Sequence, residues 1–342
     1  MLSASDLDRA LQTVYLLRTP LDQLPGPKVF RQAGQAMVEG LWGEWQRHGR
    51  PQLPVVLKPN VVWNEPAESG IVTHPAFMGG LARGLLDHGV PADQIIVAEG
   101  GGAETMMDTL DFFRVAGYVD ELAPLGVALR DLNQDASVHL IDSSRPILRH
   151  LHVSKTVLQA GTLVNVPKMK THNMAVVTLC VKNMQGMLTP INYRHLCTAY
   201  PRWEDDDGLT LDARVVDALE RFYHKLADLY MALRPDWHIL EGIVGRDGTG
   251  FRRGSNIPMG LALAGQHPLA VDQVAAQLMG FEPRSVGLLR VAAERGLWDL
   301  GWDHIQVVTW QDGAWAPCPD WRSYRAEPAF RLLRRDDLVY KD

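Results

Sequence analysis

Three lysines and a histidine lie close together in the segment 166–186, which reads VPKMKTHNMAVVTLCVKNMQG. If the first part of this segment is extended, Lys168, Lys170 and His172 point to one face, because strand side chains alternate. Lys182 follows twelve positions after Lys170 and adds another cation. Converging donors of this kind suit a phosphate, a carboxylate or an anionic cofactor.

A lysine in such a segment gains further chemistry if it is buried. Burial disfavours the charged form and lowers the pKa of the amine, which could then act as a base or a nucleophile. We therefore take Lys170 and His172 as candidate catalytic groups, and Lys168, Lys182 and Asn183 as candidate cofactor-binding groups. A solvated basic loop is the alternative interpretation.

Two other short stretches offer polar side chains to the same ligand. LPVVLKPNVV ends a predicted buried strand with Lys58 and Asn60. THP begins a predicted helix, where Thr73 is a plausible N-cap and His74 follows it. These four residues are candidates for binding and orienting an anionic ligand, and a histidine-based metal site is the alternative for His74.

The sequence EGGG places Glu99 at a strand end, before a helix. The backbone N–H groups of Gly100, Gly101 and Gly102 could receive an anion there, although a tight turn explains the glycines equally well. Glu99 is a candidate general base, metal ligand or partner of a pocket lysine. The pattern is neither G-x-G-x-x-G nor a Walker A loop, so it indicates no particular nucleotide.

Three carboxylates further along the chain form a candidate metal group. Glu241 and Asp247 lie in EGIVGRDGTG, and Asp272 lies on the following predicted helix. Together they could bind a hard cation, but the spacing of an EF-hand is absent. Structural carboxylates engaged in salt bridges are the alternative.

Regular elements must position all of these residues. Helical periodicity or capping signals predict helices at 4–17, 28–48, 73–89, 103–117, 211–233, 267–280 and 283–296. Short apolar runs predict strands at 53–62, 94–99, 126–133, 147–153, 162–166, 236–244, 257–265 and 304–310.

The alternation of strands and helices predicts an α/β fold. We expect a largely parallel sheet flanked by helices, with Rossmann-like βαβ units and two α/β lobes as a variant. The expected division is an N-terminal helical segment (1–50), an α/β core (51–310) and a C-terminal tail packed on the core (311–342). The boundary between two lobes would lie near 200–235.

Ligands on such sheets bind beyond the carboxyl ends of the strands. Lys58, Asn60, Glu99 and the 168–172 segment all follow predicted strands. We therefore expect Asn60, Glu99, His172 and Asp247 to line one cleft.

Composition narrows the class of protein. The 342-residue chain has a formal net charge of -6, which argues against nucleic-acid binding. It has no run of 18 apolar residues and no basic signal-peptide start, so we expect no membrane span and no signal peptide. Three widely spaced cysteines predict neither an iron–sulfur cluster nor a disulfide framework, so we expect a reducing, cytoplasmic setting. A homo-oligomer remains open.

Several of these motifs together resemble the family catalogued as domain of unknown function 362. The matching stretches, spread over roughly 53–296, are LKPNVV (57–62), THP (73–75), VNVPKMKTH (164–172), VTLCVKNMQG (177–186), EGIVGRDGTG (241–250) and LAVDQVAAQLMG (269–280). Some members carry an appended ferredoxin domain, which implies an oxidoreductase-type role for them. We expect no such domain here.

The chain departs from the family pattern at acidic positions. Glu99 and Glu241 stand where aspartate is common, and His267 stands where another aspartate often precedes the last motif. If those acids hold a metal in the family, its geometry would differ here. More distantly, the chain is similar to nickel-pincer lactate racemases, which implies hydroxy-acid racemisation by fold-level analogy alone.

Two functions follow from these observations. The first is an enzyme that acts on a small anionic metabolite by lysine- and histidine-assisted proton or hydride chemistry, isomerase-like or oxidoreductase-like. It would use either no cofactor, a divalent metal or an anionic nucleotide-type cofactor. The alternative is a non-catalytic accessory protein that binds or delivers a cofactor or metal.

Overall fold

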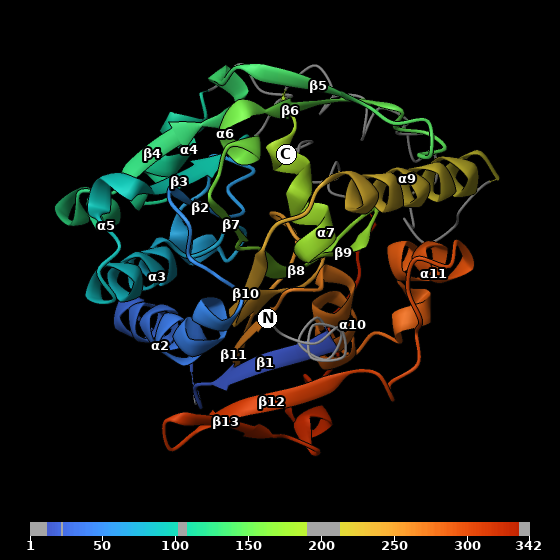
Figure 1. Ribbon diagram of the computed structural model, residues 1–342. Coiled ribbons are helices and arrows are strands. Elements are labelled where there is room, and N and C mark those ends of the chain that lie inside the picture. The colour runs from blue at the N-terminus through green and yellow to red at the C-terminus, as the bar shows by residue number, and fades with distance from the viewer. Residues whose placement is uncertain (1–11, 22, 102–107, 190–212, 335–342) are drawn as a thin grey trace, which may run out of the picture.

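A mixed sheet of eleven strands forms the centre of the molecule (Figure 1). The computed structural model describes residues 12–21, 23–101, 108–189 and 213–334. The main path of the sheet runs in the order β13-β12-β1-β11-β10-β7-β2-β3-β4, and β8 and β9 branch from β10. The helices flank this sheet, which confirms the α/β prediction.

The strands are short except for the central hairpin of β10 and β11. The sheet strands are β1 (Thr13–Arg18), β2 (Val55–Lys58), β3 (Ile95–Glu99), β4 (Ala128–Asp131), β7 (Thr162–Asn165), β8 (Lys168–His172), β9 (Val176–Thr178), β10 (Trp237–Arg246), β11 (Asn256–Gly265), β12 (Gln306–Gln311) and β13 (Ala314–Pro317). A separate hairpin pairs β5 (Ser137–Ile141) with β6 (His150–Ser154).

Part of the sheet is parallel, as the βαβ pattern predicts. Strands β7, β2, β3 and β4 pair in parallel, and β10 continues the parallel order beside β7. Strand β11 is antiparallel to both of its neighbours, which makes the whole sheet mixed. The strands of the parallel part are mostly buried on both faces, which explains their continuous apolar runs.

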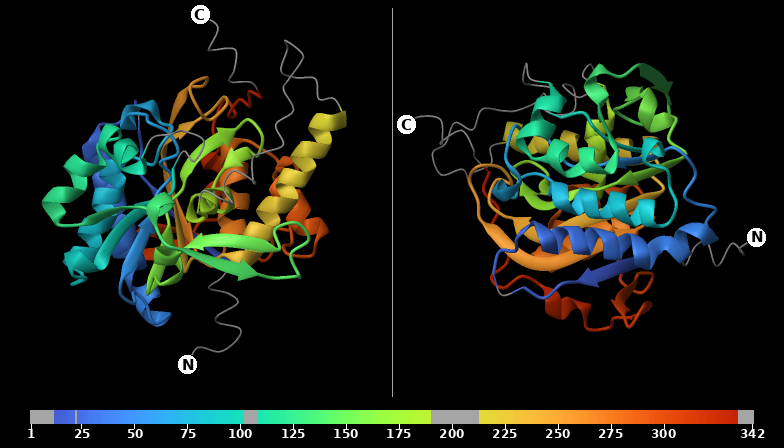
Figure 2. Two further views of the ribbon diagram at one scale, coloured as in Figure 1. Left: turned by 90° about the horizontal axis from the view of Figure 1, so that it is seen from above. Right: turned by 90° about the vertical axis from the view of Figure 1, so that its left-hand side faces the viewer.

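The helices form a layer on each face of the sheet. They are α2 (Pro27–Arg47), α3 (Pro75–Asp87), α4 (Thr109–Val115), α5 (Tyr118–Leu122), α6 (Lys155–Leu158), α7 (Cys180–Asn183), α9 (Ala213–Ala232), α10 (Pro268–Met279) and α11 (Gly287–Glu294). Helices α2 and α3 pack against each other over one face, as Figure 2 shows from that side. Helices α7, α9, α10 and α11 lie over the other face.

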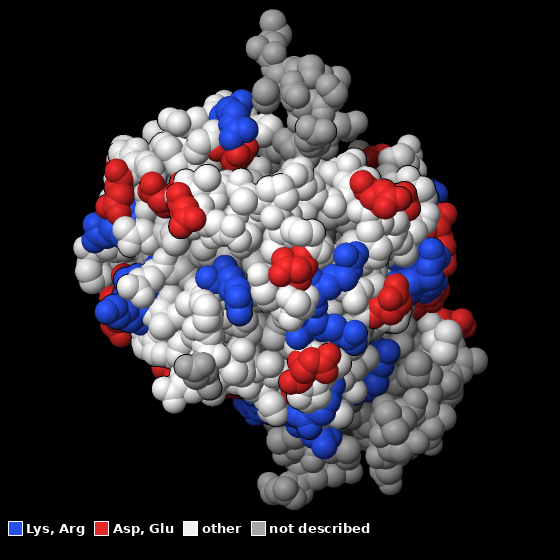
Figure 3. All heavy atoms as spheres, turned by 90° about the horizontal axis from the view of Figure 1, so that it is seen from below, with Lys and Arg blue, Asp and Glu red and all other residues white. Residues whose placement is uncertain are grey.

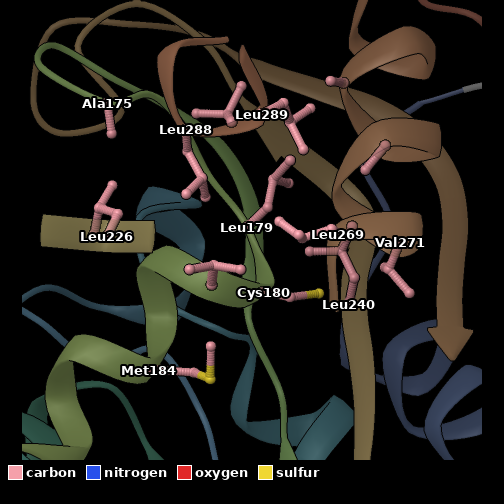
Figure 4. Packing of buried hydrophobic residues seen from close by; sticks show 14 of the residues in the cluster. Ala175, Leu179, Cys180, Met184, Leu226, Leu240, Leu269, Val271, Leu288 and Leu289 are labelled. Carbon is pink, nitrogen blue, oxygen red and sulfur yellow. The ribbon is translucent and has the colours of Figure 1, made fainter. Parts of the chain in front are cut away.

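Two apolar cores result, one between the sheet and each helical layer. The core under α7, α9, α10 and α11 is drawn in Figure 4, where Leu179, which precedes α7, lies in one apolar cluster with Leu226 of α9 and Leu288 of α11. Burial of such side chains stabilises the fold by about 1.5–3 kcal/mol each. None of the described helices combines the length and the apolar character needed to cross a bilayer.

The predicted helix at 4–17 is wrong for its described part. Residues 13–18 form strand β1, which lies between β11 and β12, so the segment 1–50 supplies a strand as well as helix α2. The apolar run VYLL is buried on both faces, so it fits both the periodicity of a helix and that of a strand. Only the two neighbouring strands select the extended form. Residues 4–11 lie outside the described residues.

One sheet joins both sides of the predicted lobe boundary. Strand β7 precedes residues 200–235, strand β10 follows them, and the two strands pair directly. The C-terminal residues also contact the core, because a bridge connects Gly248 with Leu332. The division into 1–50, 51–310 and 311–342 stays a prediction.

The predicted helix at 103–117 begins as α4 at Thr109, and its first residues lie outside the described residues.

Candidate functional site

The carboxyl ends of three parallel strands meet at one edge of the sheet. Lys58, Glu99 and Asn165 are the last residues of β2, β3 and β7, and the parallel register sets these strands side by side. The chain leaves β7 and continues into β8, which begins at Lys168. The rule that ligand sites lie beyond such strand ends thus applies to this edge.

The first ion pair at this edge joins two strand ends. Lys58 Nζ lies 2.8 Å from Glu99 Oε1, and both groups are almost fully buried. The carboxylate also accepts hydrogen bonds from the N–H of Val61 (3.0 Å) and of Gly100 (2.9 Å). Glu99 is therefore the partner of a pocket lysine, and both of its oxygens are engaged.

A second buried ion pair lies on the neighbouring strands. Lys168 Nζ lies 2.5 Å from Glu241 Oε2. The other carboxylate oxygen accepts a hydrogen bond from the N–H of Ile243 at 3.0 Å. Glu241 thereby neutralises a lysine.

Lys58, Lys168, Lys170 and Lys182 form what we call the lysine cluster. Burial is the main cause that lowers the pKa of Lys58 and of Lys170; the charge of Lys182 lowers both further, and the charge of Lys168 also lowers that of Lys170. Because such effects act only over short distances in a protein, the four amines share one region. Its two carboxylates are each paired with a different lysine.

Lys170 differs from the paired lysines. Only 1% of the residue is exposed, and Nζ donates a hydrogen bond to the carbonyl of Ile71 at 2.9 Å. The amine also lies 4.9 Å from the centre of the Phe251 ring. Among the described residues it contacts no carboxylate. Burial first, and then the charges of Lys182 and Lys168, hold the pKa of Lys170 well below its usual range.

His172 is buried beside this amine and is held in one tautomer. Its Nδ1 accepts hydrogen bonds from the backbone N–H groups of Met174 (3.1 Å) and Ala175 (3.2 Å). Burial, followed by the charges of Lys182 and Lys170, holds the pKa of His172 well below its usual range. The neutral ring therefore carries its proton on Nε2, which is a donor rather than a base.

Lys182 and Asn183 lie on the short element α7. Lys182 Nζ lies 2.5 Å from Gln185 Oε1. Asn183 accepts a hydrogen bond from Asn60 Nδ2 at 2.9 Å and donates one to Asn165 Oδ1 at 2.8 Å. The predicted binding residues Asn60 and Asn183 are thus joined directly, and Asn165 extends them into a chain of buried amides.

Thr73 and His74 serve the local structure around this site. Thr73 Oγ1 accepts from the N–H of Asn60 and donates to the carbonyl of Val166, both at 2.9 Å. His74 caps helix α3 with Nδ1, and its ring stacks on Phe30 at 3.8 Å. Burial is the main cause that lowers the pKa of His74 to about 3, so this ring is neutral as well.

The glycine turn after β3 uses its backbone donors internally. The N–H of Gly100 donates to the side chain of Glu99 and to the carbonyl of Gly186, at 2.9 and 3.1 Å. The N–H of Gly101 donates to a threonine hydroxyl at the start of α4. These contacts favour the tight-turn interpretation over anion binding by the glycines. Gly102 lies outside the described residues.

The three carboxylates predicted as a metal group point to different partners. Asp247 pairs with Arg331 at 2.7 Å, Asp272 accepts from the N–H of Cys180 at 2.6 Å, and Glu241 faces the lysine cluster. Burial raises the pKa of Asp272 to about 7. Within the described residues, no three His, Cys, Asp or Glu side chains are arranged to hold a metal ion. Glu241 and Asp247 therefore form salt bridges, as the alternative interpretation has it, whereas Asp272 accepts backbone hydrogen bonds.

That Asn60, Glu99, His172 and Asp247 line one cleft stays a prediction, but the structure shows which of them lie close together. Asn60, Glu99 and His172 lie around the lysine cluster through the contacts above. The loop of Asp247 also packs beside β8, where Thr171 donates to the carbonyl of Gly248 at 2.8 Å. The carboxylate of Asp247, however, is directed to the C-terminal segment rather than to Lys170.

Sequence reasoning missed three residues of this region. Asn165, whose amide bonds to both Asn183 and His238, is a polar residue inside the apolar run LVNV, and that anomaly was a usable signal. His238 similarly interrupts the apolar run WHIL. Phe251, over which the Lys170 amine lies, had no such signal, because only the tertiary fold brings its loop to β8.

The lysine cluster is an internal feature rather than a surface patch. All four lysines are largely shielded from solvent, and three of them are at most 1% exposed. On the face shown in Figure 3, basic and acidic side chains are interspersed among neutral ones. The excess of positive charge at the strand ends therefore lies inside the protein rather than on its surface.

Comparisons with known proteins find similarity over most of the chain. The thylakoid-associated protein sll1697 of Synechocystis sp. is 25% identical over 254 residues, which cover 72% of this chain and 70% of that protein. Among solved structures, the lactate racemase apoprotein from Thermoanaerobacterium thermosaccharolyticum is 12% identical with a TM-score of 0.46, over 80% of this chain. A Thermotoga maritima protein is 11% identical with a TM-score of 0.37, over 66% of it.

The present chain spans 58% and 52% of the lengths of those two solved chains. A family model matches residues 55–277, a range that includes every residue of the lysine cluster. The chain therefore belongs to the family described as domain of unknown function DUF362.

Proposed function

We propose that this protein is an enzyme that binds a small anionic metabolite at the lysine cluster and moves a proton on it, with Lys170 as the base. One observation carries the proposal: the buried amine of Lys170 contacts no carboxylate among the described residues. A lysine without such a partner is costly to bury as a cation. It is therefore available as a neutral amine.

The distribution of charge supports an anionic ligand. Glu99 neutralises Lys58 and Glu241 neutralises Lys168, so each acid is already paired with a lysine other than Lys170. An anion that enters would meet the positive charge of Lys182 and the N–H donors of the neutral Lys170 amine, in surroundings where water screens little. A substrate carboxylate and the phosphate of a nucleotide-type cofactor would both satisfy this requirement.

The proposed step is a proton transfer at a carbon next to a carbonyl or carboxyl group. The neutral Lys170 amine takes the proton, and the electron pair of the broken C–H bond moves onto the adjacent oxygen. His172 Nε2–H then donates a hydrogen bond to that oxygen and stabilises its developing charge. Return of the proton from Lys170 completes an isomerisation without any net oxidation.

The roles predicted for two other residues change under this proposal. Glu99 holds Lys58 with both oxygens, so it positions the site and does not act as the base. His172 already accepts two hydrogen bonds at Nδ1, so it acts as a donor through Nε2. Of the three residues predicted to be catalytic, Lys170 is therefore the one that we assign as the proton acceptor.

Hydrogen exchange with solvent tests this function even while the substrate is unidentified. The protein is incubated in D2O with a panel of small carboxylates and phosphate esters, and loss of C–H signals is followed by proton NMR. The wild type should exchange at least one member of the panel. Lys170→Met should slow that exchange about 10²–10⁴-fold, as expected for loss of a general base.

Lys28→Met is the matched control, because Lys28 is an exposed lysine on α2 far along the chain from the site. It should exchange at the wild-type rate. If Lys170→Met also exchanges at that rate, Lys170 is not the base. If the wild type exchanges nothing but releases a stoichiometric anionic ligand on denaturation, the protein is a carrier.

A further inference from the structure

Four buried polar side chains form a continuous hydrogen-bonded chain behind the lysine cluster. Asn60 Nδ2 donates to Asn183 Oδ1 at 2.9 Å, and Asn183 Nδ2 donates to Asn165 Oδ1 at 2.8 Å. Asn165 Nδ2 lies 3.0 Å from Nδ1 of His238. All four residues are at most 7% exposed, so water does not compete for these bonds along the chain.

The direction of this chain is set by groups that can only accept. Asn165 Nδ2 also donates to the carbonyl of Cys180 at 2.8 Å, which leaves Asn165 Oδ1 toward Asn183. Asn183 Nδ2 also faces the carbonyl of Pro59 at 3.3 Å. Both amides are therefore oriented by backbone oxygens, and Asn60 must present its nitrogen to Asn183.

The free end of the chain is consequently an acceptor. Asn60 Oδ1 is buried and accepts no hydrogen bond from the described residues. If the Asn60 amide were turned over, its Oδ1 would face Asn183 Oδ1, and two acceptors would oppose each other. The amide chain therefore cannot satisfy Asn60 Oδ1 by itself. A buried acceptor without a partner is rare in proteins and costly.

Asn60 lies within the region of the lysine cluster. It follows Lys58 by two residues, and its backbone exchanges two hydrogen bonds with Thr73, through Thr73 Oγ1 and between Thr73 N–H and the Asn60 carbonyl. The Lys170 amine reaches the carbonyl of Ile71, two residues before Thr73. The unpaired oxygen therefore belongs to the same site as the amines that would hold an anion.

We propose that Asn60 Oδ1 is a specificity-determining acceptor, which selects anions that carry an O–H or N–H donor beside the acid group. This inference rests on the proposed function and narrows its substrate class to small hydroxy or amino acids and their phosphorus analogues. The lysines bind the acid group but can only donate. Asn60 supplies the acceptor, and Asn183 and Asn165 position it.

The physical basis of the selection is the cost of the unpaired oxygen. A ligand with a donor pairs with Oδ1 and removes this cost, whereas an analogue without one leaves the oxygen unsatisfied. Sites built around a buried hydrogen-bonding group reject such analogues strongly. We expect the donor to improve affinity at least about tenfold, since an unsatisfied buried group carries a large desolvation penalty.

Matched ligand pairs test this in the wild-type protein by titration calorimetry. Glycolate is compared with acetate and with methoxyacetate, which keeps the oxygen but lacks the donor. Hydroxymethylphosphonate is compared with methylphosphonate. The donor-bearing member of each set should bind at least about tenfold more tightly, and methoxyacetate should resemble acetate.

Variants assign the preference to Asn60. In Asn60→Ala the affinities within each pair should agree to within about twofold, because the acceptor is gone. Asn133→Ala is the control, since Asn133 also has a buried unpaired Oδ1 but does not contact the amide chain. It should keep the wild-type preference. Should Asn60→Ala fail to fold, equal binding within the wild-type ligand pairs would still overturn the proposal.

The outcomes separate this inference from the proposed function. Equal binding of both members in the wild type, with weaker binding in Lys170→Met, would overturn the role of Asn60 and leave the anion site intact. A donor preference that survives in Asn60→Ala would also overturn it. If no anion of either series binds, the anion site fails, and the selection by Asn60 fails with it.

Discussion

Lys170 shows how a neighbourhood changes the chemistry of one side chain. In the unfolded chain it is an ordinary cation, but in the fold it loses its water and faces Lys182 and Lys168. Its polar contact is a backbone carbonyl, which stabilises a cation less than a carboxylate does. The protein therefore holds this amine at a cost in stability, which is typical of groups kept for function.

That cost should appear as a pH-dependent difference between wild type and Lys170→Met. The unfolded lysine keeps its proton up to a pKa of about 10.4, whereas the folded amine releases it at lower pH. Between the two values the unfolded state binds more protons, so the wild-type free energy of unfolding rises with pH, by at most about 1.4 kcal/mol per unit.

The variant lacks this contribution, so it should exceed the wild type in stability at neutral pH and lose that advantage as the pH approaches 10. Urea denaturation at several pH values measures the difference. Lys28→Met, at an exposed site, should show no such trend. A constant difference between wild type and Lys170→Met would mean that the folded amine titrates normally.

At the scale of elements, a close approach between two turns positions the first ion pair. The turn after α7 brings Gly186 against the end of β3, where the Gly100 N–H donates to the Gly186 carbonyl. A Cβ atom at position 186 would lie 2.0 Å from Glu99 Oε1 and 3.1 Å from Lys58 Cε. The absence of a side chain there lets Glu99 face Lys58.

Gly186→Ala should therefore displace the carboxylate and destabilise the protein. Overpacking of this kind costs about 1–3 kcal/mol, and disturbance of a buried ion pair adds to it. Gly43→Ala is the counterpart, because Gly43 lies on α2 with no atom near its added Cβ. It should stabilise the helix by about 0.5–1 kcal/mol. If chemical denaturation gave the same change in the free energy of unfolding for Gly186→Ala and Gly43→Ala, the close packing at Gly186 would be contradicted.

At the scale of the molecule, the strand nearest the N-terminus unites the sheet. Strand β1 pairs with β11 on one side and with β12 on the other. It is the path by which β12 and β13 join the rest of the sheet. Its loss would therefore affect residues almost 300 positions later in the chain.

A pair of leucines tests this connection. Leu16 is fully buried in β1, whereas Leu24 is 54% exposed in the following connection. Leu16→Ala should lower the free energy of unfolding by about 2–5 kcal/mol, and Leu24→Ala should change it by less than about 0.5 kcal/mol. Hydrogen exchange at β12 should also accelerate in Leu16→Ala alone. Unchanged protection there would show that β12 is stable without β1.

Much of the architecture could be predicted because periodic patterns are local. The strands at 53–62, 94–99 and 162–166 carry buried runs, and the helix at 73–89 has its terminating glycine within the segment, although its cap is His74 rather than the predicted Thr73. The wrong prediction of a helix at 4–17 also arises because the pattern is only local. Its run VYLL is buried on both faces, and the partner strands that select β1 lie more than 200 residues away.

The sequence by itself determined which residues could do chemistry at the strand ends, because the lysines, His172 and Asn60 lie in or beside recognisable strands. Only the tertiary structure decided which partner, and therefore which role, each of these residues has. It paired Glu99 with Lys58 and Glu241 with Lys168, and it directed Asp247 elsewhere. The physical reason is that the charge of a buried group depends on which partners reach it, and those partners come from distant parts of the chain.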